Sequence, residues 1–268
     1  TINENKYPLF IMVDHYSLAS PWEGYLKKFA PILVIDDLND RSHDCSWLVD
    51  QTHDKSDTEY INLAPKNCHF FIGSKFALLR KEFSDHTQKT IRTFPEKKVK
   101  ILITLGGVDK NNDTARIAKY VLNNNFGKDV SLTLVSGSIN PNLQELKMLA
   151  EKNPNIRVIV DEKSMAKLMG AHDICIGAAG STSWERCAMS LPTITVSIAE
   201  NQKVIAKNLD ISHATINLGE IDQLTEKGLI STISHIVENR TLFQSLVTNS
   251  RNLCDGLGCQ RILREVIK

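Results

Sequence analysis

The sequence lacks an excess of charge of either sign, and it lacks long apolar runs. Its 268 residues include 32 lysines and arginines against 31 aspartates and glutamates, for a formal net charge of +1. Nucleic-acid phosphates are usually held by a broad basic surface, so no nucleic-acid partner is expected. The most apolar stretches, such as 9–13 and 173–179, are only strand-length. They are too short to cross a bilayer, so no membrane span is expected.

Motifs for metals, ATP and disulfides are missing as well. The 8 histidines show no metal-ligand spacing of the HExxH kind, so we expect neither a metal nor another cofactor. No Gly-Lys-Ser/Thr follows a glycine-rich turn, which excludes the phosphate loop of ATPases. The 6 cysteines form no CxxC pair, and Cys175 lies within an apolar run. Together with the lack of a signal peptide, this favours reduced thiols and a cytoplasmic location.

The first part of the chain alternates between strand-like and helix-like segments. Apolar runs occur at 9–13, 32–35, 47–49 and 70–72, separated by polar or helix-length stretches, which predicts an α/β arrangement. The polar, charged stretch 84–100 then reads as an interdomain linker. We therefore expect one domain over 1–96, including the linker, and a second over 97–268.

The second part has a regular strand and helix rhythm. Strands are expected at 100–105, 131–135, 156–160, 173–176 and 192–198, with helices between them and a mostly helical tail from about Ile221. Asn112 or Asp113 can cap the first of these helices. Parallel neighbours need a crossover that a helix supplies, so the pattern predicts a parallel, right-handed, doubly wound sheet. Ligands of such sheets bind beyond the carboxyl ends of the strands.

A turn of small residues follows the expected strand 173–176 and opens a helix. Gly180, Ser181 and Thr182 allow close backbone approach to a ligand, and free N–H groups at a helix start favour an anion such as a diphosphate. Glu185 lies one helical turn beyond Ser181, where a carboxylate can accept hydrogen bonds from ribose hydroxyls. The alternative is an ordinary tight turn with a serine or threonine cap and an exposed acid in the first helical turn.

Other strand ends carry weaker signals. Gly106 and Gly107 close the expected strand 100–105, although strand-ending glycines are common. Asn201 and Gln202 follow strand 192–198, where their amides can reach a sugar hydroxyl or a phosphate, or can be a helix cap and an exposed amide.

In the first half, one apolar strand ends on Asp14, His15 and Tyr16. Strand ends facing a cleft suit general acid and base groups, whereas any single histidine or tyrosine there is more often structural.

Several strings in the same order resemble a known family. The segment VDEKSMAKLMGAHDICIGAAGSTSWERCAMSLPTITVSIAENQ (160–202) looks like the nucleotide-binding segment of the glycosyltransferase family 28 superfamily, which includes the peptidoglycan N-acetylglucosaminyltransferases. The strings VDHYSL, VIDDLNDRSHDCSWLVDQT, FIGSKFALLRKEF, LITLGGVD and GSTSWERC more closely resemble the UDP-sugar hydrolases of pseudaminic acid biosynthesis. The match runs over nearly the whole chain, and the ordered series of strings is more specific than any one of them.

The resemblance implies a glycosyltransferase-B-like α/β fold, with two Rossmann-like domains of parallel strands. It also implies a UDP-sugar substrate, UDP as product, and attack of water on the anomeric carbon without a metal. The implied nucleotide contacts are Gly106, Gly107, Val160, Met165, Gly180, Ser181, Thr182, Glu185 and Gln202, with Val160 and Met165 around the uracil. The implied catalytic group comprises Tyr16, Asn201 and Asp14.

One departure from the family pattern concerns the GxGHxxR string, whose histidine is thought to act as general base in the family and which does not occur here. It suggests an incomplete N-terminal domain, short by about seventy to ninety residues of a typical member. His15 matches a different family position and does not fill that role. Two alternatives to hydrolysis therefore stay open: a UDP-sugar-dependent transferase, and a UDP-sugar-binding remnant without catalysis.

Overall fold

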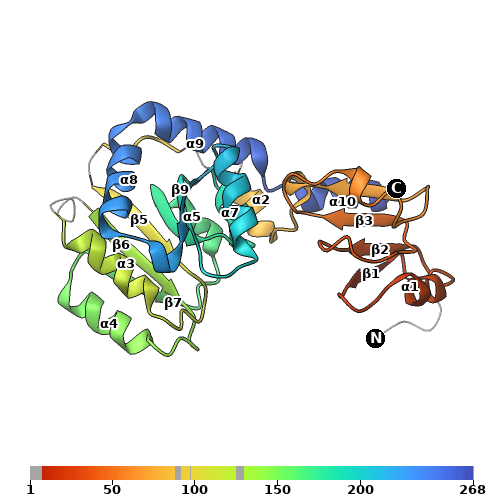
Figure 1. Cartoon of the computed structure of the whole chain (residues 1–268), viewed down its shortest axis with the longest axis horizontal. Coiled ribbons are helices and arrows are strands. Elements are labelled where there is room, and N and C mark those ends of the chain that lie inside the picture. The colour runs from red at the N-terminus through yellow and green to blue at the C-terminus, as the bar shows by residue number, and fades with distance from the viewer. Residues whose placement is uncertain (1–7, 88–91, 97, 125–129, 268) are drawn as a thin grey trace. The chain divides into compact units, whose positions relative to one another are not determined.

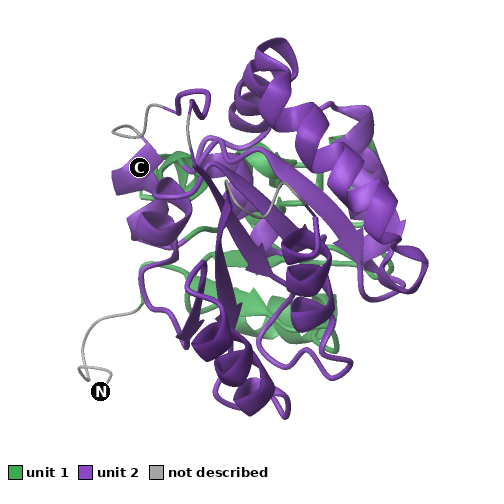
Figure 2. Cartoon of the chain, turned by 90° about the vertical axis from the view of Figure 1, so that its left-hand side faces the viewer, with its two compact units in different colours: residues 1–79, 257–268 green, residues 80–256 purple. Residues whose placement is uncertain are grey.

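The computed structural model describes residues 8–87, 92–96, 98–124 and 130–267. The chain divides into two compact units (Figure 2). Unit 1 is Thr1–Leu79 with Leu257–Lys268, and unit 2 is Arg80–Gly256. The last residues of the chain thus belong to the first unit. Independent folding of domains divided between residues 96 and 97 stays a prediction.

Unit 1 is built on a parallel sheet with strand order β1-β2-β3-β4. The strands are β1 (Ile11–Asp14), β2 (Ile32–Ile35), β3 (Trp47–Asp50) and β4 (His69–Ile72), which confirms the four expected strands with small shifts at their ends. Helix α1 (Ser20–Leu26) connects β1 to β2, and the short 3-10 helices η1 (Asp57–Glu59) and η2 (Ser74–Phe76) lie in connections. Helix α10 (Gly258–Val266) completes the unit (Figure 1).

The sheet of unit 1 is covered on both faces because successive strand residues point to opposite sides. Val34 and Leu48 belong to one buried cluster with Tyr60. Their chain neighbours Leu33 and Val49 belong to the other cluster, which includes Ile262 and Val266 of α10. The C-terminal helix therefore packs on one face of a sheet formed near the N-terminus.

Unit 2 contains a parallel sheet with strand order β10-β9-β8-β5-β6-β7. The strands are β5 (Val99–Thr104), β6 (Val130–Ser136), β7 (Ile156–Val160), β8 (Ile174–Ala178), β9 (Thr193–Ser197) and β10 (Ile216–Glu220). The central strands β5 and β8 read as nearly continuous apolar runs because both of their faces are buried. The chain adds strands outward from β5 in both directions, so the order reverses between β5 and β8.

Helices cover both faces of this sheet and connect its strands (Figure 1). The helices of unit 2 are α2 (Lys81–Thr87), α3 (Asp113–Leu122), α4 (Leu143–Lys152), α5 (Met165–Gly170), α6 (Thr182–Ala188), α7 (Gln202–Ile211), α8 (Glu226–Glu238) and α9 (Arg240–Leu253), with the 3-10 helix η4 (Ile221–Gln223) after β10. The expected doubly wound α/β fold is confirmed, as is the helical tail.

Three local expectations differ from the structure. The expected linker 84–100 begins inside α2, and its residues 88–91 and 97 lie outside the described residues. Strand β10 was not expected, because Asn217 and the positive φ of Gly219 interrupt its apolar pattern at a register shift. Helix α3 is capped by neither Asn112 nor Asp113. The carboxylate of Asp109 accepts from the backbone N–H groups of residues 113 and 114, each at 2.9 Å.

Candidate functional site

The carboxyl ends of the strands of unit 2 bring the expected nucleotide residues to one edge of the sheet. The loop after β5 contains Gly106 and Gly107, and the loop after β8 contains Gly180 and Ser181. These two loops flank the point where the strand order reverses, which is where open parallel sheets bind ligands.

The loop after β8 presents unpaired backbone donors. Within the described part of the chain, the N–H groups of Gly180, Ser181 and Thr182 donate to no backbone carbonyl, whereas Ser183 N donates to the Gly180 carbonyl at 2.9 Å. Ser181 occupies the N-cap position of α6 without a side-chain capping bond. Successive free N–H groups at an exposed turn suit an anion. Ser181 thus holds the N-cap position of the alternative interpretation without making its side-chain bond.

Gln202 of the loop after β9 lies beside the same turn. A Cβ placed on Gly180 would be 3.7 Å from Nε2 of Gln202. The Oε1 atom of Gln202 accepts from Ile198 N at 3.1 Å, which fixes the amide group. Its Nε2 is therefore an additional donor next to Gly180. Asn201 is exposed at the N-cap of α7 and makes no capping bond.

The glycines after β5 allow a tight approach between two loops. Gly106 has φ of +100°, a conformation that favours glycine. The carbonyl of Gly107 accepts from Gly137 N, in the loop after β6, at 3.0 Å. A Cβ on Gly137 would stand 2.6 Å from that carbonyl oxygen. Both Gly106 and Gly107 are exposed at the carboxyl end of the sheet.

Glu185 is half-buried one turn into α6, and its carboxylate is paired with Arg80. Arg80 Nη2 lies 3.5 Å from Glu185 Oε1. Burial raises the pKa of the Glu185 carboxyl, and the charge of Arg80 partly opposes that shift. A carboxylate that is partly dehydrated and held by one cation can still accept from hydroxyl groups of a ligand.

Arg80 is a residue that sequence reasoning missed. Its guanidinium ion-pairs with Glu82 at 2.9 Å, donates to the Lys163 carbonyl at 3.2 Å, and lies 5.4 Å from the centre of the Phe83 ring. It thus connects Glu185 of α6 to the loop after β7. No local pattern signals this contact, because Arg80 and Glu185 are 105 residues apart.

The two residues expected around a base lie on either side of the loop after β7. Val160 ends β7 and Met165 begins α5, and both are half-buried. Between them, Asp161 adopts a φ of +51° and accepts from Ser138 N at 2.9 Å. Hydrogen bonds from the side chain and then the backbone of Ser138 lower the pKa of the Asp161 carboxyl. The Ala166 N–H donates to Glu82 at 3.2 Å. The loop after β7 is therefore bonded to the loop after β6, and the first turn of α5 is bonded to α2.

Arg186 was also missed, and it lies directly beneath the loop after β8. Its side chain is buried, and its Nη atoms donate to the Ala178 carbonyl, Thr182 Oγ1 and Ser183 Oγ. Gly177 makes room for it, since a Cβ there would stand 2.7 Å from Nη1 of Arg186. The spacing from Thr182 to Arg186 is one helical turn, which was the only available signal.

In unit 1, Asp14 and Tyr16 follow β1 and are exposed. The negative charge of Asp37 raises the pKa of the Tyr16 phenol, and a hydrogen bond between them adds to the shift. Burial raises the pKa of the Asp37 carboxyl, and the nearby negative charges of Asp50 and Asp36 raise it further. Tyr16 is therefore a neutral phenol at neutral pH, next to a carboxylate that sequence reasoning did not single out.

Behind this pair, two buried carboxylates share one phenol. Tyr60 Oη lies 3.0 Å from Asp36 Oδ2 and 2.9 Å from Asp50 Oδ2. Arg41 pairs with Asp36 at 2.7 Å, and Lys55 pairs with Asp50 at 3.0 Å. Burial and the two carboxylates strongly raise the pKa of the Tyr60 phenol. The carboxyl ends of β2 and β3 thus carry a compensated charge network.

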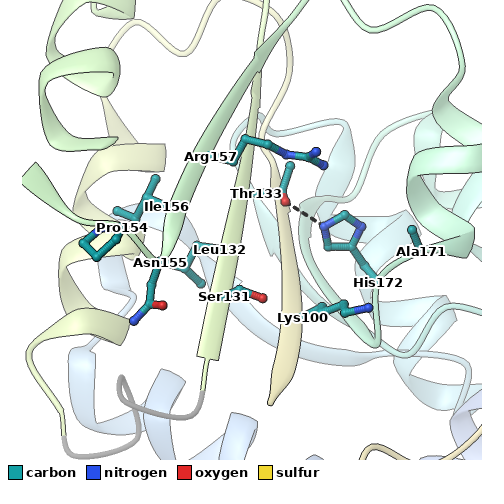
Figure 3. A pocket seen from close by; sticks show the side chains of 10 residues that line it. All are labelled: Lys100, Ser131, Leu132, Thr133, Pro154, Asn155, Ile156, Arg157, Ala171 and His172. Carbon is teal, nitrogen blue, oxygen red and sulfur yellow. Dashed lines mark hydrogen bonds between the residues drawn. The ribbon is translucent and has the colours of Figure 1, made fainter. Parts of the chain in front are cut away.

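A cavity of ≈ 310 Å³ lies at the opposite edge of the unit 2 sheet (Figure 3). It is lined by residues at the amino ends of β5, β6 and β7, including Lys100, Ser131 and Arg157. His172 borders it, with Nδ1 2.7 Å from the Leu168 carbonyl and Nε2 2.7 Å from Thr133 Oγ1. None of the expected nucleotide contacts lines this cavity, so we separate it from the candidate site.

The part of the chain that the structure describes contains no group of three or more histidine, cysteine, aspartate or glutamate side chains that could hold a metal ion. In the same part of the chain, no helix combines the length and the apolar character that a membrane span requires.

The sequence of unit 2 matches a family of glycosyltransferases. Residues 99–253, more than half of the chain, match the glycosyltransferase family 28 C-terminal domain. The chain belongs to this family. The resemblance to the family and the glycosyltransferase-B-like fold expected from it are confirmed.

Individual relatives sharpen the comparison. The UDP-2,4-diacetamido-2,4,6-trideoxy-beta-L-altropyranose hydrolase of Campylobacter jejuni is 28% identical over 206 residues, which are 76% of this chain and 72% of that protein. The spore coat polysaccharide biosynthesis protein SpsG of Bacillus subtilis is 29% identical over 162 residues, 60% of this chain and 48% of SpsG. The crystal structure of Acinetobacter baumannii MurG has a TM-score of 0.64 at 15% identity, covering 96% of this chain and 72% of MurG.

The Campylobacter relative is named for its action on a UDP-sugar, and the matching family is one of glycosyltransferases. The match spans less than half the length of SpsG.

Proposed function

We propose that this protein hydrolyses a UDP-linked diacetamido-trideoxy sugar, releasing UDP and the free sugar for pseudaminic acid biosynthesis in the bacterial cytoplasm. The observation that carries the proposal is the loop after β8, whose unpaired N–H groups lie at the reversal of strand order in a family 28 domain. The similarity to the Campylobacter hydrolase supports the sugar and the reaction.

In the proposed complex, the backbone of Gly180, Ser181 and Thr182 binds the diphosphate. Gln202 contributes its amide N–H beside Gly180. Charge grows on the leaving phosphate as the bond between the anomeric carbon and its oxygen breaks, and fixed donors stabilise that charge without a metal.

The nucleoside is proposed to extend away from this loop toward β7. Glu185 accepts from the ribose hydroxyls, displacing part of its contact with Arg80. Val160 and Met165 enclose the uracil, and Gly106 and Gly107 allow the backbone after β5 to approach the ligand. The exposure of the two glycines at the carboxyl end of the sheet supports their part in this assignment.

For catalysis, the proposal assigns Tyr16, Asp14 and Asn201 to the sugar and the attacking water. The neutral phenol of Tyr16 can donate a hydrogen bond, because its pKa is raised by Asp37. Asn201 lies next to the nucleotide contact Gln202, where its amide can bind a sugar hydroxyl.

The test is to incubate the chain with UDP-2,4-diacetamido-2,4,6-trideoxy-beta-L-altropyranose and to measure free UDP and free sugar together. Equal amounts of both, formed without an added acceptor, support hydrolysis. Release of UDP only with a sugar acceptor supports a transferase, the second candidate, which the family name favours. Binding of UDP without turnover of any UDP-sugar supports the third candidate, a binding protein.

A further inference from the structure

Arg186 is a buried cation that the proposed contacts with the nucleotide leave unused. Only 1% of its surface is exposed. Nη2 donates to the Ala178 carbonyl at 2.7 Å and to Ser183 Oγ at 3.0 Å, and Nη1 donates to Thr182 Oγ1 at 2.9 Å. All three acceptors are uncharged. The third nitrogen, Nε, is buried and has no hydrogen-bond partner among the described residues.

No carboxylate among the described residues forms an ion pair with this guanidinium. The nearest acid in sequence is Glu185. The charge of Arg186 lowers the pKa of the Glu185 carboxyl slightly against the effect of burial, but the carboxylate is paired with Arg80 instead. A buried charge is costly unless an opposite charge compensates it. The protein alone therefore leaves a positive charge under the turn formed by Gly180 and Ser181.

The structure around the guanidinium is adapted to hold it. Gly177 of β8 leaves room for the guanidinium, since a Cβ at this position would clash with Nη1 at 2.7 Å. Thr182 Oγ1 accepts from Nη1, so the hydroxyl hydrogen of Thr182 is directed to some other acceptor. Thr182 is half-buried at the start of α6 and carries one of the unpaired N–H groups. The cation thus prepares both charge and donors on the loop.

We propose that Arg186 is the positioning residue of the diphosphate subsite. Its charge attracts the anion through the thin layer of loop backbone, and its bond to Thr182 makes that hydroxyl a donor to a phosphate oxygen. The identity of the ligand rests on the proposed function, whereas the preference for a diphosphate group rests on Arg186 itself.

The experiment compares three probes on the full chain: UDP, inorganic pyrophosphate and uridine. Arg186→Met removes the charge, and Arg186→Lys keeps it with fewer directed donors. We expect Arg186→Met to weaken UDP and pyrophosphate binding about ten- to a hundredfold, the scale of a lost charge-assisted interaction, and to leave uridine nearly unchanged. Arg186→Lys should recover part of the loss. Arg157→Met removes an exposed cation at the opposite sheet edge and controls for net charge.

Gly177→Ala supplies a second route if the Met variant unfolds in a thermal melt. It retains Arg186 but displaces the guanidinium, so it should weaken pyrophosphate and UDP while sparing uridine. Equal losses for all three probes, or pyrophosphate binding that is the same in wild type and variants, would overturn the role of Arg186. Failure of the proposed function looks different: the wild type would bind pyrophosphate in an Arg186-dependent way and show no preference for UDP over ADP.

Discussion

The two units carry opposite chemistry at the carboxyl ends of their parallel strands. In unit 1, β1 and β3 end on Asp14 and Asp50, and Asp36 follows β2. The buried carboxylates of Asp36 and Asp50 are compensated by Arg41 and Lys55. In unit 2, the corresponding loops contain glycines and unpaired N–H groups above a cation without a counter-charge.

In both units the parallel strands bring these loops together at the carboxyl end of the sheet. The residues of the loops decide whether an anionic or a cationic ligand binds there favourably. In unit 1, the buried carboxylates are paired with cations of the same unit, and the Tyr60 phenol between them keeps its proton because its pKa is raised. In unit 2, the buried cation of Arg186 has no such charged partner among the described residues, which favours an anionic ligand. The predictions below test this contrast, from the largest expected effect to the smallest.

Breaking the compensated charge network should destabilise unit 1 most. Asp50→Ala removes the carboxylate that pairs with Lys55 and one of the two buried carboxylates that accept from the Tyr60 hydroxyl, so we expect a loss of about 3–5 kcal/mol in the free energy of unfolding. Hydrogen exchange should show faster opening of β2 and β3, with β5 and β8 less affected. Asp57→Ala removes an exposed carboxylate of the same unit and should change little. Equal effects of both substitutions would mean that the network contributes no stability.

The C-terminal helix provides the next test. Ile262→Ala should cost about 2–4 kcal/mol, because Ile262 is buried against Leu33, Val49 and Phe71 of unit 1. Leu263→Ala, on the exposed side of the same helix, is the matched control. If β5 and β8 of unit 2 open faster in hydrogen exchange and β2 and β3 do not, the assignment of α10 to unit 1 is wrong.

These elements show how far sequence alone carries the fold. Buried parallel strands such as β5 and β8 were predictable because their apolar runs are nearly continuous. The 3.6-residue period of α10 predicts a helix but does not tell which sheet it covers. Strand β10 escaped detection because its apolar positions are interrupted and it lies at the sheet edge.

The site shows the same division between local and long-range information. Gly180 and Ser181 were recognisable because a small-residue turn between strand and helix is a local pattern. Arg80 was not, since its partner Glu185 is distant in sequence. Arg186 is near in sequence, but its burial depends on the missing side chain of Gly177 on another element.

Removing the proposed ribose acceptor should have a smaller effect, confined to ligand binding. Glu185→Ala is expected to weaken UDP binding by about 1–3 kcal/mol, the scale of a lost hydrogen bond to a charged group. The effect should shrink for a uracil nucleotide that lacks ribose hydroxyls. An equal loss with the deoxyribose analogue, measured by calorimetry, would remove Glu185 from the ribose.

The smallest effect concerns pH. Burial raises the pKa of Glu185, so the folded chain favours its protonated form, and the stability from that proton is present at low pH and lost as pH rises through the raised pKa. UDP binding needs the ionised form and has the opposite dependence: affinity should fall as pH falls through the same raised pKa. Glu185→Gln should flatten this part of the profile while leaving the titration of the UDP phosphate. Identical profiles for both proteins would contradict the assignment.

The most direct test of the account is calorimetric titration of the full chain with UDP, ADP and CMP under one set of conditions. An anion site at the reversal of strand order, next to a base pocket at Val160 and Met165, predicts saturable one-to-one binding of UDP. Binding of ADP and CMP should be at least about tenfold weaker, a difference of about 1.4 kcal/mol. No binding of UDP, or equal affinity for the three nucleotides, would contradict a UDP-specific site in unit 2.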